Sequence, residues 1–432
     1  MQLTIYRGTR EIGGNCVEFQ AGSTRLIVDI GIPLFDADGE PFDAKSLEGK
    51  SNEELIEEKL LPKVPGLFGP GSPPDAILLS HAHLDHTGLL TYAQSTIPVF
   101  ATVGTSKMMQ AGGIFAGGVE LPEQRFRKLV PGREVAIGDF RVTAFSVDHS
   151  VFGSVALLIE ADGKAVLYSG DIRLHGRKRR MARQLWAALE NKTVDVLVME
   201  GTHLGSERSA GLDEYELEEE IVRQIKPSGL VMASFSPQHI DRLVAFIRTA
   251  IRTQRLFVAD VYCAYVLHLI HLPTIPKPIR EDGMAVFYPK WMTSSLKRRR
   301  LDKIHDMFLG SQITLEEILT APQRHLMLFR PSMLESDFRG NLPTGVQCFF
   351  SRWEGYLDKP DWAETRAKIE NAGGELITVH TSGHIFPRDL ATFVERVKPR
   401  VLVPIHTQKP EAFQGICESV RVLSDGEPFE IT

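Results

Sequence analysis

The sequence predicts an α/β protein in which a second α/β domain interrupts the first. Three observations lead to this prediction. Apolar hairpins dominate the first part of the 432-residue chain, strands alternate with helices in the middle part, and residue types that bind metals return only in the last segment. We therefore expect one domain to consist of residues 1–205 and 371–432, and an inserted domain to consist of residues 206–370.

The first part of the chain consists of segments typical of strands joined by short turns, one of them expected at Asp162-Gly163. A stretch rich in Pro and Gly (33–74) is expected to form an ordered insertion loop, with a short acidic helix at 52–61. The apolar segment 75–80 is expected to be a buried strand that leads directly into HAHLDHTGLL.

From about residue 206 the pattern favours a parallel sheet with helices between its strands. The expected elements are helix 213–226, strand 229–236, helix 240–253, strand 255–260, and strands 325–330 and 346–351. The last part continues the alternation with strand 375–380, helix 388–398 and strand 400–406.

Composition indicates an ordinary folded protein, with 43% hydrophobic and 24% charged residues. No apolar run reaches the roughly 18–20 residues of a membrane span, and the N-terminal sequence does not resemble a signal peptide, so we expect a cytoplasmic location. The four cysteines form no CxxC pair and are expected to be reduced. A net charge of −6 excludes a uniformly basic nucleic-acid binder, although basic residues cluster at 175–183 and 297–303.

The strongest chemical signal is the run HAHLDH (81–86), which places four potential metal ligands within six residues. In an extended or turning segment, alternate side chains point the same way, so His81 and His83 can bind one ion together. Asp85 and His86, around the bend, can face a second ion. Two divalent ions about 3.5–4 Å apart activate a shared water and stabilise the attacking and leaving oxygens of a displacement.

This HxHxDH run resembles the signature of the metallo-β-lactamase superfamily, whose other motifs follow in order. Asp29 in LIVDIG matches the first motif, an Asp that orients the histidine-rich loop. His149 in SVDHS would complete three histidines on the first metal, and Asp171 in LYSGD would bridge both metals. The resemblance covers roughly the first 205 residues and the last 60. It implies an αββα sandwich.

Later motifs resemble those of the β-CASP group, the nucleic-acid-processing branch of the superfamily. Glu200 ends VDVLVME, His384 ends the run HTSGH (380–384), and His406 ends RVLVPIH. The resemblance implies that the inserted domain is a β-CASP cap, that His406 is the last ligand of the second metal, and that His384 meets the scissile phosphate, held by Glu200. This chain departs from the usual pattern of the group at two places, since GTHLG follows Glu200 and Thr-Gln follows His406. They leave the substrate and the polarity of attack open.

Four further residues are expected near the phosphate of a substrate. His380 and Ser382 lie in the HxSGH run, which closely resembles that of ribonuclease J and its archaeal relatives. Ser234 and Ser236 end a predicted strand before a helix, where small polar side chains either bind phosphate or act as N-caps. Both interpretations of the two serines stay open.

The expected metal ligands divide into two sets that share one carboxylate. They are His81, His83 and His149 on one ion, Asp85, His86 and His406 on the other, and Asp171 between them. Asp85, Glu200 and His384 are the residues expected to take part in the reaction. Zinc is the expected metal, with manganese or iron as alternatives.

We therefore expect a two-metal phosphodiesterase that hydrolyses RNA, or single-stranded DNA, through a metal-activated hydroxide. One alternative is a hydrolase of a small ester, thioester or lactone on the same centre, although the HxSGH run and the inserted domain argue against it. Another is a nucleic-acid-binding scaffold with a decayed centre, against which the complete ligand set argues. No membrane partner is expected, and exonucleolytic or endonucleolytic action and homo-oligomerisation are left open.

Overall fold

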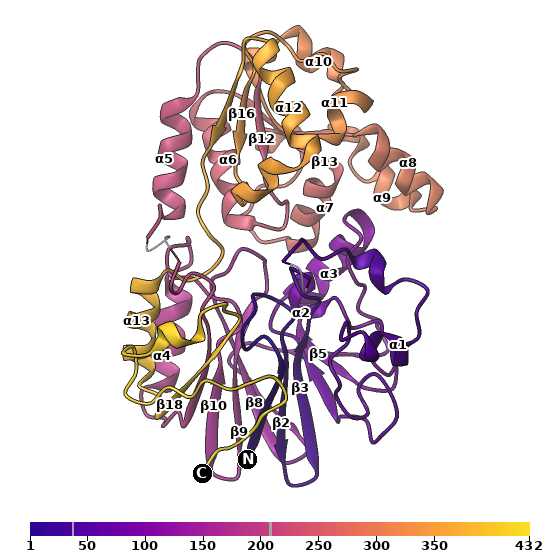
Figure 1. The fold of residues 1–432 in the computed structure, drawn as a ribbon. Coiled ribbons are helices and arrows are strands. Elements are labelled where there is room, and N and C mark those ends of the chain that lie inside the picture. Colours follow the sequence, from indigo (N-terminus) through magenta and orange to yellow (C-terminus); the bar gives the residue numbers. More distant parts are fainter. Residues whose placement is uncertain (37–38, 207–209) are drawn as a thin grey trace. The chain divides into compact units, whose positions relative to one another are not determined.

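The computed structural model describes residues 1–36, 39–206 and 210–432, which pack as two compact units. Unit 1 comprises Met1–Gly211 and Gly383–Thr432, and unit 2 comprises Leu212–Ser382 (Figure 1). The second boundary lies beyond the expected residue 370, because strand β17 (Glu375–Thr378) pairs with β16 (Gln347–Phe350) in the sheet of unit 2. The first boundary likewise lies after the expected residue 205.

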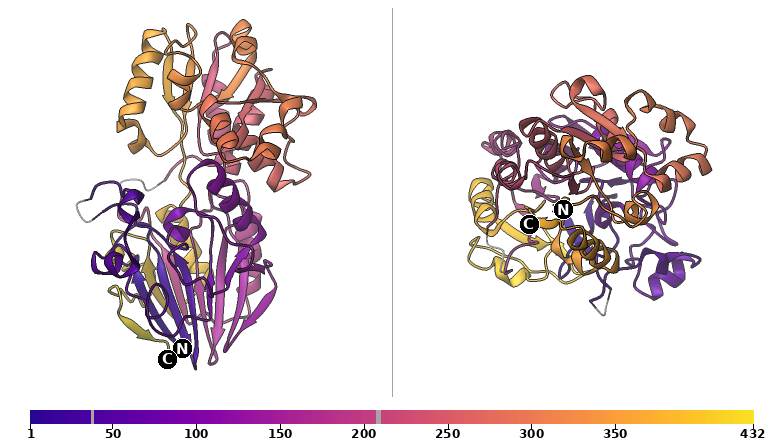
Figure 2. Two further views of the ribbon diagram at one scale, coloured as in Figure 1. Left: turned by 90° about the vertical axis from the view of Figure 1, so that its right-hand side faces the viewer. Right: turned by 90° about the horizontal axis from the view of Figure 1, so that it is seen from above.

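Unit 1 is built around two sheets (Figures 1 and 2). The first contains, in spatial order, β19 (Pro428–Glu430), β1 (Gln2–Arg7), β2 (Cys16–Ala21), β3 (Thr24–Ile30), β4 (Ala76–Leu78), β5 (Val99–Thr102) and β6 (Phe126–Leu129). The second contains β18 (Val401–Ile405), β11 (Val196–Glu200), β10 (Lys164–Tyr168), β9 (Val155–Ala161), β8 (Phe140–Ser146) and β7 (Glu134–Ile137).

Helices cover the outer faces of both sheets, which gives the predicted αββα sandwich. Leu3 and Phe19 of the first sheet and Leu157 of the second lie in the core between the sheets. The helices beside the first sheet are α1 (Asn52–Glu57), α2 (Leu84–Thr87) and α3 (Val103–Phe115), and those beside the second are α4 (Arg180–Leu189) and α13 (Pro387–Val397).

The stretch 33–74 is more than a surface loop, because several of its described side chains enter the core under the first sheet. Leu55 of α1 and Leu67 are fully buried there, beside Ile27 and Ile77 of the sheet. The sequence pattern showed the helix but not the packing of its surroundings.

Unit 2 is a parallel sheet with helices on both faces, as the alternating pattern predicted. Its strands follow the order β14 (Met284–Phe287), β13 (Leu256–Asp260), β15 (His325–Leu328), β12 (Val231–Ser234), β16 and β17. One face carries α5 (Glu214–Gln224), α6 (Ile240–Arg252) and α7 (Val261–Ile270). The other carries α10 (Leu315–Thr320), α11 (Ser332–Ser336) and α12 (Pro360–Asn371). The remaining helices are α8 (Lys290–Arg298) and α9 (Asp302–Asp306).

Two strand pairings bring late residues of the chain back to early ones in unit 1. Strand β19 pairs antiparallel with β1, so the two chain ends lie side by side (Figure 2). Strand β18 runs parallel to β11 with Ile405 opposite Glu200, so His406 follows at the end where Glu200 lies. The four cysteines are free, and in the described part of the chain no helix is long and apolar enough for a membrane span.

Candidate metal centre

The predicted metal ligands follow the carboxyl ends of strands in unit 1. His81 comes shortly after β4, His149 after β8, Asp171 after β10 and His406 directly after β18. Strands β10, β11 and β18 run parallel, so their carboxyl ends share one edge of the second sheet. The seven predicted ligands meet there in two overlapping groups.

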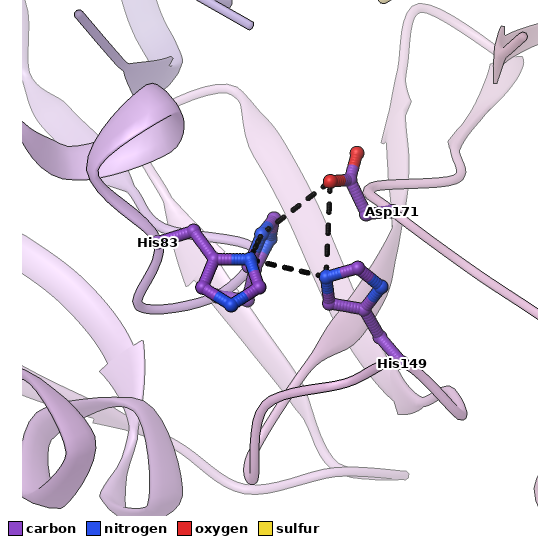
Figure 3. A group of neighbouring side chains, drawn as sticks. His83, His149 and Asp171 are labelled. Carbon is purple, nitrogen blue, oxygen red and sulfur yellow. Dashed lines mark hydrogen bonds and ion pairs between the residues drawn. The ribbon is translucent and has the colours of Figure 1, made fainter. Parts of the chain in front are cut away.

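The first group consists of His81, His83, His149 and Asp171, whose candidate ligand atoms all lie within 4.8 Å of one another. The Nδ1 atom of His83 lies 3.1 Å from Nε2 of His81 and 3.1 Å from Nε2 of His149. Figure 3 shows the imidazoles of His83 and His149 and the carboxylate of Asp171 directed toward one another. Three nitrogens and one oxygen form a donor set suited to a zinc-type ion.

The second group consists of Asp85, His86, Asp171 and His406, again with ligand atoms within 4.8 Å of one another. Nε2 of His406 lies 3.3 Å from Oδ2 of Asp85, and Nε2 of His86 lies 3.3 Å from Oδ2 of Asp171. The same Asp171 oxygen lies 3.6 Å from Nε2 of His81 in the first group. Asp171 is therefore placed between the two groups.

Buried polar atoms without hydrogen bonds test whether this cluster fits metal ions. Both carboxylate oxygens of Asp171 and the Nε2 atom of His86 are buried and make no hydrogen bond. Such orphaned groups are costly unless another partner satisfies them. A divalent cation at each group would be that partner, so the residues fit a two-metal centre.

The protonation preferences of the three histidines in the first group agree with this fit. Burial lowers the pKa of His81 and of His149 well below the usual value for histidine. Burial also lowers the pKa of His83. All three imidazoles are therefore neutral near pH 7, which is the form that binds metals.

Asp29 fixes the orientation of His86 through a hydrogen-bond network. Its Oδ2 atom lies 2.8 Å from Nδ1 of His86, which leaves Nε2 directed at the cluster. The Asp29 carboxylate also accepts hydrogen bonds from the backbone and the hydroxyl of Ser80 and from the hydroxyl of Tyr168. Partners of this kind hold a metal-bound imidazole in one tautomer and one rotation.

The backbone around the cluster is tightly constrained. Asp29 and His406 have φ angles of 57° and 53°, in the left-handed region that residues other than glycine seldom adopt. Gly31 lies so close to the histidine-rich loop that a Cβ atom there would sit 1.6 Å from the carbonyl oxygen of Asp85. Only glycine permits this approach.

His384 lies beside the cluster and contacts Glu200. Its Nδ1 atom is 3.3 Å from Oε1 of Glu200, 3.2 Å from Oγ1 of Thr202 and 3.6 Å from Oδ2 of Asp171. Burial by itself lowers the pKa of His384, but the carboxylates of Glu200 and Asp171 outweigh it and raise the pKa to about 9. The side chain stays 21% exposed, so a substrate can reach it.

Glu200 is held in place by three backbone amides. Its carboxylate accepts hydrogen bonds from the amides of Ile172, Thr202 and Ile385. A carboxylate fixed in this way can orient a neighbouring imidazole. Glu200, His384 and His406 also form a third group of potential ligands, although Nδ1 of His384 faces Glu200.

The four residues expected near a substrate phosphate belong to unit 2. Ser234 is buried at the end of β12, Ser236 is exposed, and Ser382 is buried. His380 has its Nδ1 atom 3.3 Å from a guanidinium nitrogen of Arg242. Helix α6 begins at Ile240 with His239 as its N-cap, so neither serine caps that helix.

Three residues around the cluster were not predicted. Ser80 and Tyr168 bind Asp29, and Oγ1 of Thr202 contacts both His384 and His406, the latter at 2.9 Å from Nδ1. Ser80 directly precedes the HAHLDH run and Thr202 lies two residues after Glu200, so their position in the sequence could have indicated a role at the site. Tyr168 lies in an apolar strand run and looked like an ordinary core residue.

Comparisons with known proteins agree with this geometry. Residues 54–233 match the model of the β-lactamase superfamily domain. Ribonuclease J of Helicobacter pylori is 22% identical over 100% of this chain and 61% of its own length. Ribonuclease J of Mycolicibacterium smegmatis is 25% identical over 94% and 68% of the two chains. Transcription termination factor FttA of Methanothermobacter thermautotrophicus is 24% identical over 92% and 65%.

The chain spans roughly two thirds or less of the length of these relatives. A crystal structure of a protein of unknown function from Enterococcus faecalis V583 aligns over 99% of both chains, with a TM-score of 0.80 and 22% identity. It shows the same fold.

Proposed function

Because the chain belongs to the metallo-β-lactamase superfamily, we propose that it is a metal-dependent phosphodiesterase that hydrolyses RNA. One observation carries the proposal. Two ligand groups share Asp171, and the pair His384–Glu200 lies directly beside them with His384 accessible. A dinuclear centre next to a cationic side chain suits a substrate whose reacting group is an anion.

His81, His83 and His149 would hold one ion, and Asp85, His86 and His406 the other, with Asp171 as the bridge. Zinc suits the imidazole-rich first set, and manganese is the alternative because carboxylates contribute to the second. When bound, the ions supply Lewis-acid activation of water and neutralise charge on the phosphoryl group. Asp85 and Asp171 offset the positive charge of the two ions.

His384 and Glu200 would act on the substrate itself. Glu200 keeps His384 protonated and oriented, so His384 either donates a proton to the leaving oxygen or neutralises a phosphoryl oxygen. His380, Ser382, Ser234 and Ser236 of unit 2 would bind phosphate groups of the same strand.

RNA is the proposed substrate because two of the relatives, which align with 100% and 94% of this chain, are named ribonuclease J. Single-stranded DNA is the second polymer to test. A small ester would need neither His384 beside the metal groups nor the inserted unit 2.

The test is digestion of end-labelled RNA and DNA of one sequence, together with a small ester, by protein of measured metal content. We expect about two ions per chain and RNA cleavage that a chelator abolishes and added zinc or manganese restores. Protein that reproducibly lacks metal and activity contradicts the two-metal centre. Protein that holds two ions but hydrolyses only the ester contradicts the nuclease.

A further inference from the structure

The carboxyl edge of the sheet in unit 2 carries polar residues that the proposed reaction does not use. Four neighbouring strands end there in the order β13, β15, β12 and β16. Asp260 ends β13, Arg330 follows β15 and Arg352 follows β16. Ligands of open α/β sheets bind outside the carboxyl ends of the strands.

Arg330 has a fixed position but an incomplete set of partners. Its Nε atom donates a hydrogen bond of 2.7 Å to Oδ2 of Asp260, and its guanidinium carbon lies 5.5 Å from the ring centre of Tyr262. Asp260 also accepts a hydrogen bond from the amide of Cys263 at the start of α7. The Nη2 atom of Arg330 is buried without a hydrogen bond.

Arg352 lies near Arg330, and its Nε atom is likewise buried without a hydrogen bond. Burial and the positive charge of Arg330 lower the pKa of Arg352 to about 10. Asp260, already bound to Arg330, is the nearby carboxylate that acts on Arg352. The Nη2 atom of Arg330 and the Nε atom of Arg352 are therefore two cationic donor groups without a hydrogen bond, and both are available to an anion.

Aromatic side chains adjoin Arg352 along the chain. Trp353 and Tyr356 are 50% and 39% exposed, and their rings meet edge to face at 5.6 Å. The ammonium group of Lys359 lies 4.9 Å from the ring of Tyr356. Exposed aromatic rings beside cationic groups are the arrangement on which single-stranded nucleic acids bind by stacking and charge.

We propose that Arg330 and Arg352 bind one backbone phosphate of a single-stranded RNA, with Trp353 and Tyr356 stacking on the adjacent bases. The planar guanidinium fork matches two phosphate oxygens, and the orphaned Nη2 and Nε groups supply the missing donors. The inference rests on the proposed function, because it assigns a binding site for the same substrate.

Arg352→Gln tests the site, since the buried Nε atom of Arg352 has no hydrogen bond to the described residues that the substitution would break. Arg366→Gln is the matched control, because it removes the same charge from an exposed position of α12 in the same unit. Each protein, loaded with metal, is titrated into a labelled oligouridylate with phosphorothioate linkages, which resist hydrolysis but keep their charge. Binding is followed by fluorescence anisotropy at several salt concentrations.

Arg352→Gln should weaken binding about tenfold and reduce the slope of log K against log salt by about 0.7, the value for one phosphate contact on a single strand. Arg366→Gln should stay within about twofold of the parent. Arg352→Lys should restore the slope and part of the affinity, because it keeps the charge but not the fork. Recovery of the slope would separate a phosphate contact from a folding defect.

Equal affinity and equal slope for the two Gln variants would overturn the phosphate site, as would a parent protein that binds no RNA. Hydrolysis of ordinary RNA is measured in parallel. If RNA is hydrolysed normally but Arg352→Gln does not change RNA binding, the result counts against this site and leaves the nuclease proposal standing. Binding that depends on Arg352 in a protein that cleaves no RNA supports the site and counts against the nuclease alone.

Discussion

At the scale of single residues, the carboxylate of Asp171 has an unusual position. Both of its oxygens are buried without a hydrogen bond, while five imidazole rings approach one of them within 4 Å. An unsatisfied buried group costs about 1–3 kcal/mol, and more if it is charged. Positive charge close to Asp171 therefore favours its ionised form, and a bound cation would supply that charge.

Replacement of His384 by Ala should separate the reaction from metal binding. His384 contacts Glu200 through Nδ1 and completes neither of the two groups that share Asp171. The variant should keep nearly all of its metal, while RNA cleavage falls about 100-fold or more, as expected for a lost proton donor or charge stabiliser. His86→Ala is the contrasting variant and should lower metal content and activity together.

Metal analysis and initial rates on end-labelled RNA check this prediction. His384→Ala protein that loses half of its metal would show that His384 is a ligand. Cleavage at the parent rate would remove it from the reaction.

Replacement of Gly31 by Ala should disturb the centre without changing any ligand side chain. The added methyl group would collide with backbone atoms of Asp85 and His86, which cannot rotate away as a side chain can. We expect a loss of about 1–3 kcal/mol in the free energy of unfolding, the range found for overpacked sites, and weaker metal binding.

Gly69→Ala is the matched control in the same unit, because its Cβ would meet only Ile56, at 3.9 Å. Urea unfolding and zinc titration of both variants provide the measurement. Equal stability of the two variants would mean that the loop accommodates the methyl group.

Metal-binding residues could be predicted from the sequence where histidines and aspartates cluster or match a known motif. His81, His83, Asp85 and His86 lie within six residues, and alternation along an extended segment is sufficient to pair them. Tyr168 could not be predicted, because its bond to Asp29 joins residues 139 positions apart. Its role depends on how the two sheets of unit 1 pack against each other, and a local sequence pattern carries no information on that packing.

At the scale of elements, β17 decides where unit 2 ends. It pairs with β16 in parallel register, from Gln347–Glu375 to Phe350–Thr378. The sequence showed β17 as a strand, but it could not show which sheet the strand joins, since both sheets accept a short apolar segment. Because predicted ligand residues follow soon after β17, the sequence pattern favoured placing this strand in the first domain.

A fragment of residues 212–382 should therefore fold alone, whereas a fragment of 206–370 should be markedly less stable. Ending the fragment at residue 370 removes β17. This exposes the edge of β16 and the apolar surface that Ile377 and Val379 cover. Far-UV circular dichroism during urea unfolding compares the two fragments. Equal midpoints would contradict the assignment of β17 to the core of unit 2.

At the scale of the whole molecule, each unit has its own hydrophobic core, and all predicted metal ligands lie in unit 1. Chelation should therefore lower the melting temperature of one calorimetric transition and leave the other unchanged. Metal at 1,000 times its dissociation constant would stabilise unit 1 by about 4 kcal/mol.

Phe246→Ala identifies the transition of unit 2, because Phe246 is fully buried in α6 and stacks on Phe235. This variant should shift the transition that is insensitive to chelation. Equal shifts of both transitions on chelation would show that the units do not respond separately to metal.

The place of His406 in the chain has a consequence for protein synthesis. His406 is the last of the seven predicted ligands to be translated. The 171 residues of unit 2 (Leu212–Ser382) lie between it and the other six. The ribosome needs about 12–47 s to add the 235 residues that separate Asp171 from His406 at about 5–20 residues per second. During this interval the nascent chain carries six of the seven predicted ligands next to its own messenger. Chains arrested before residue 400 should therefore leave RNA intact, and chains released after His406 should cleave it.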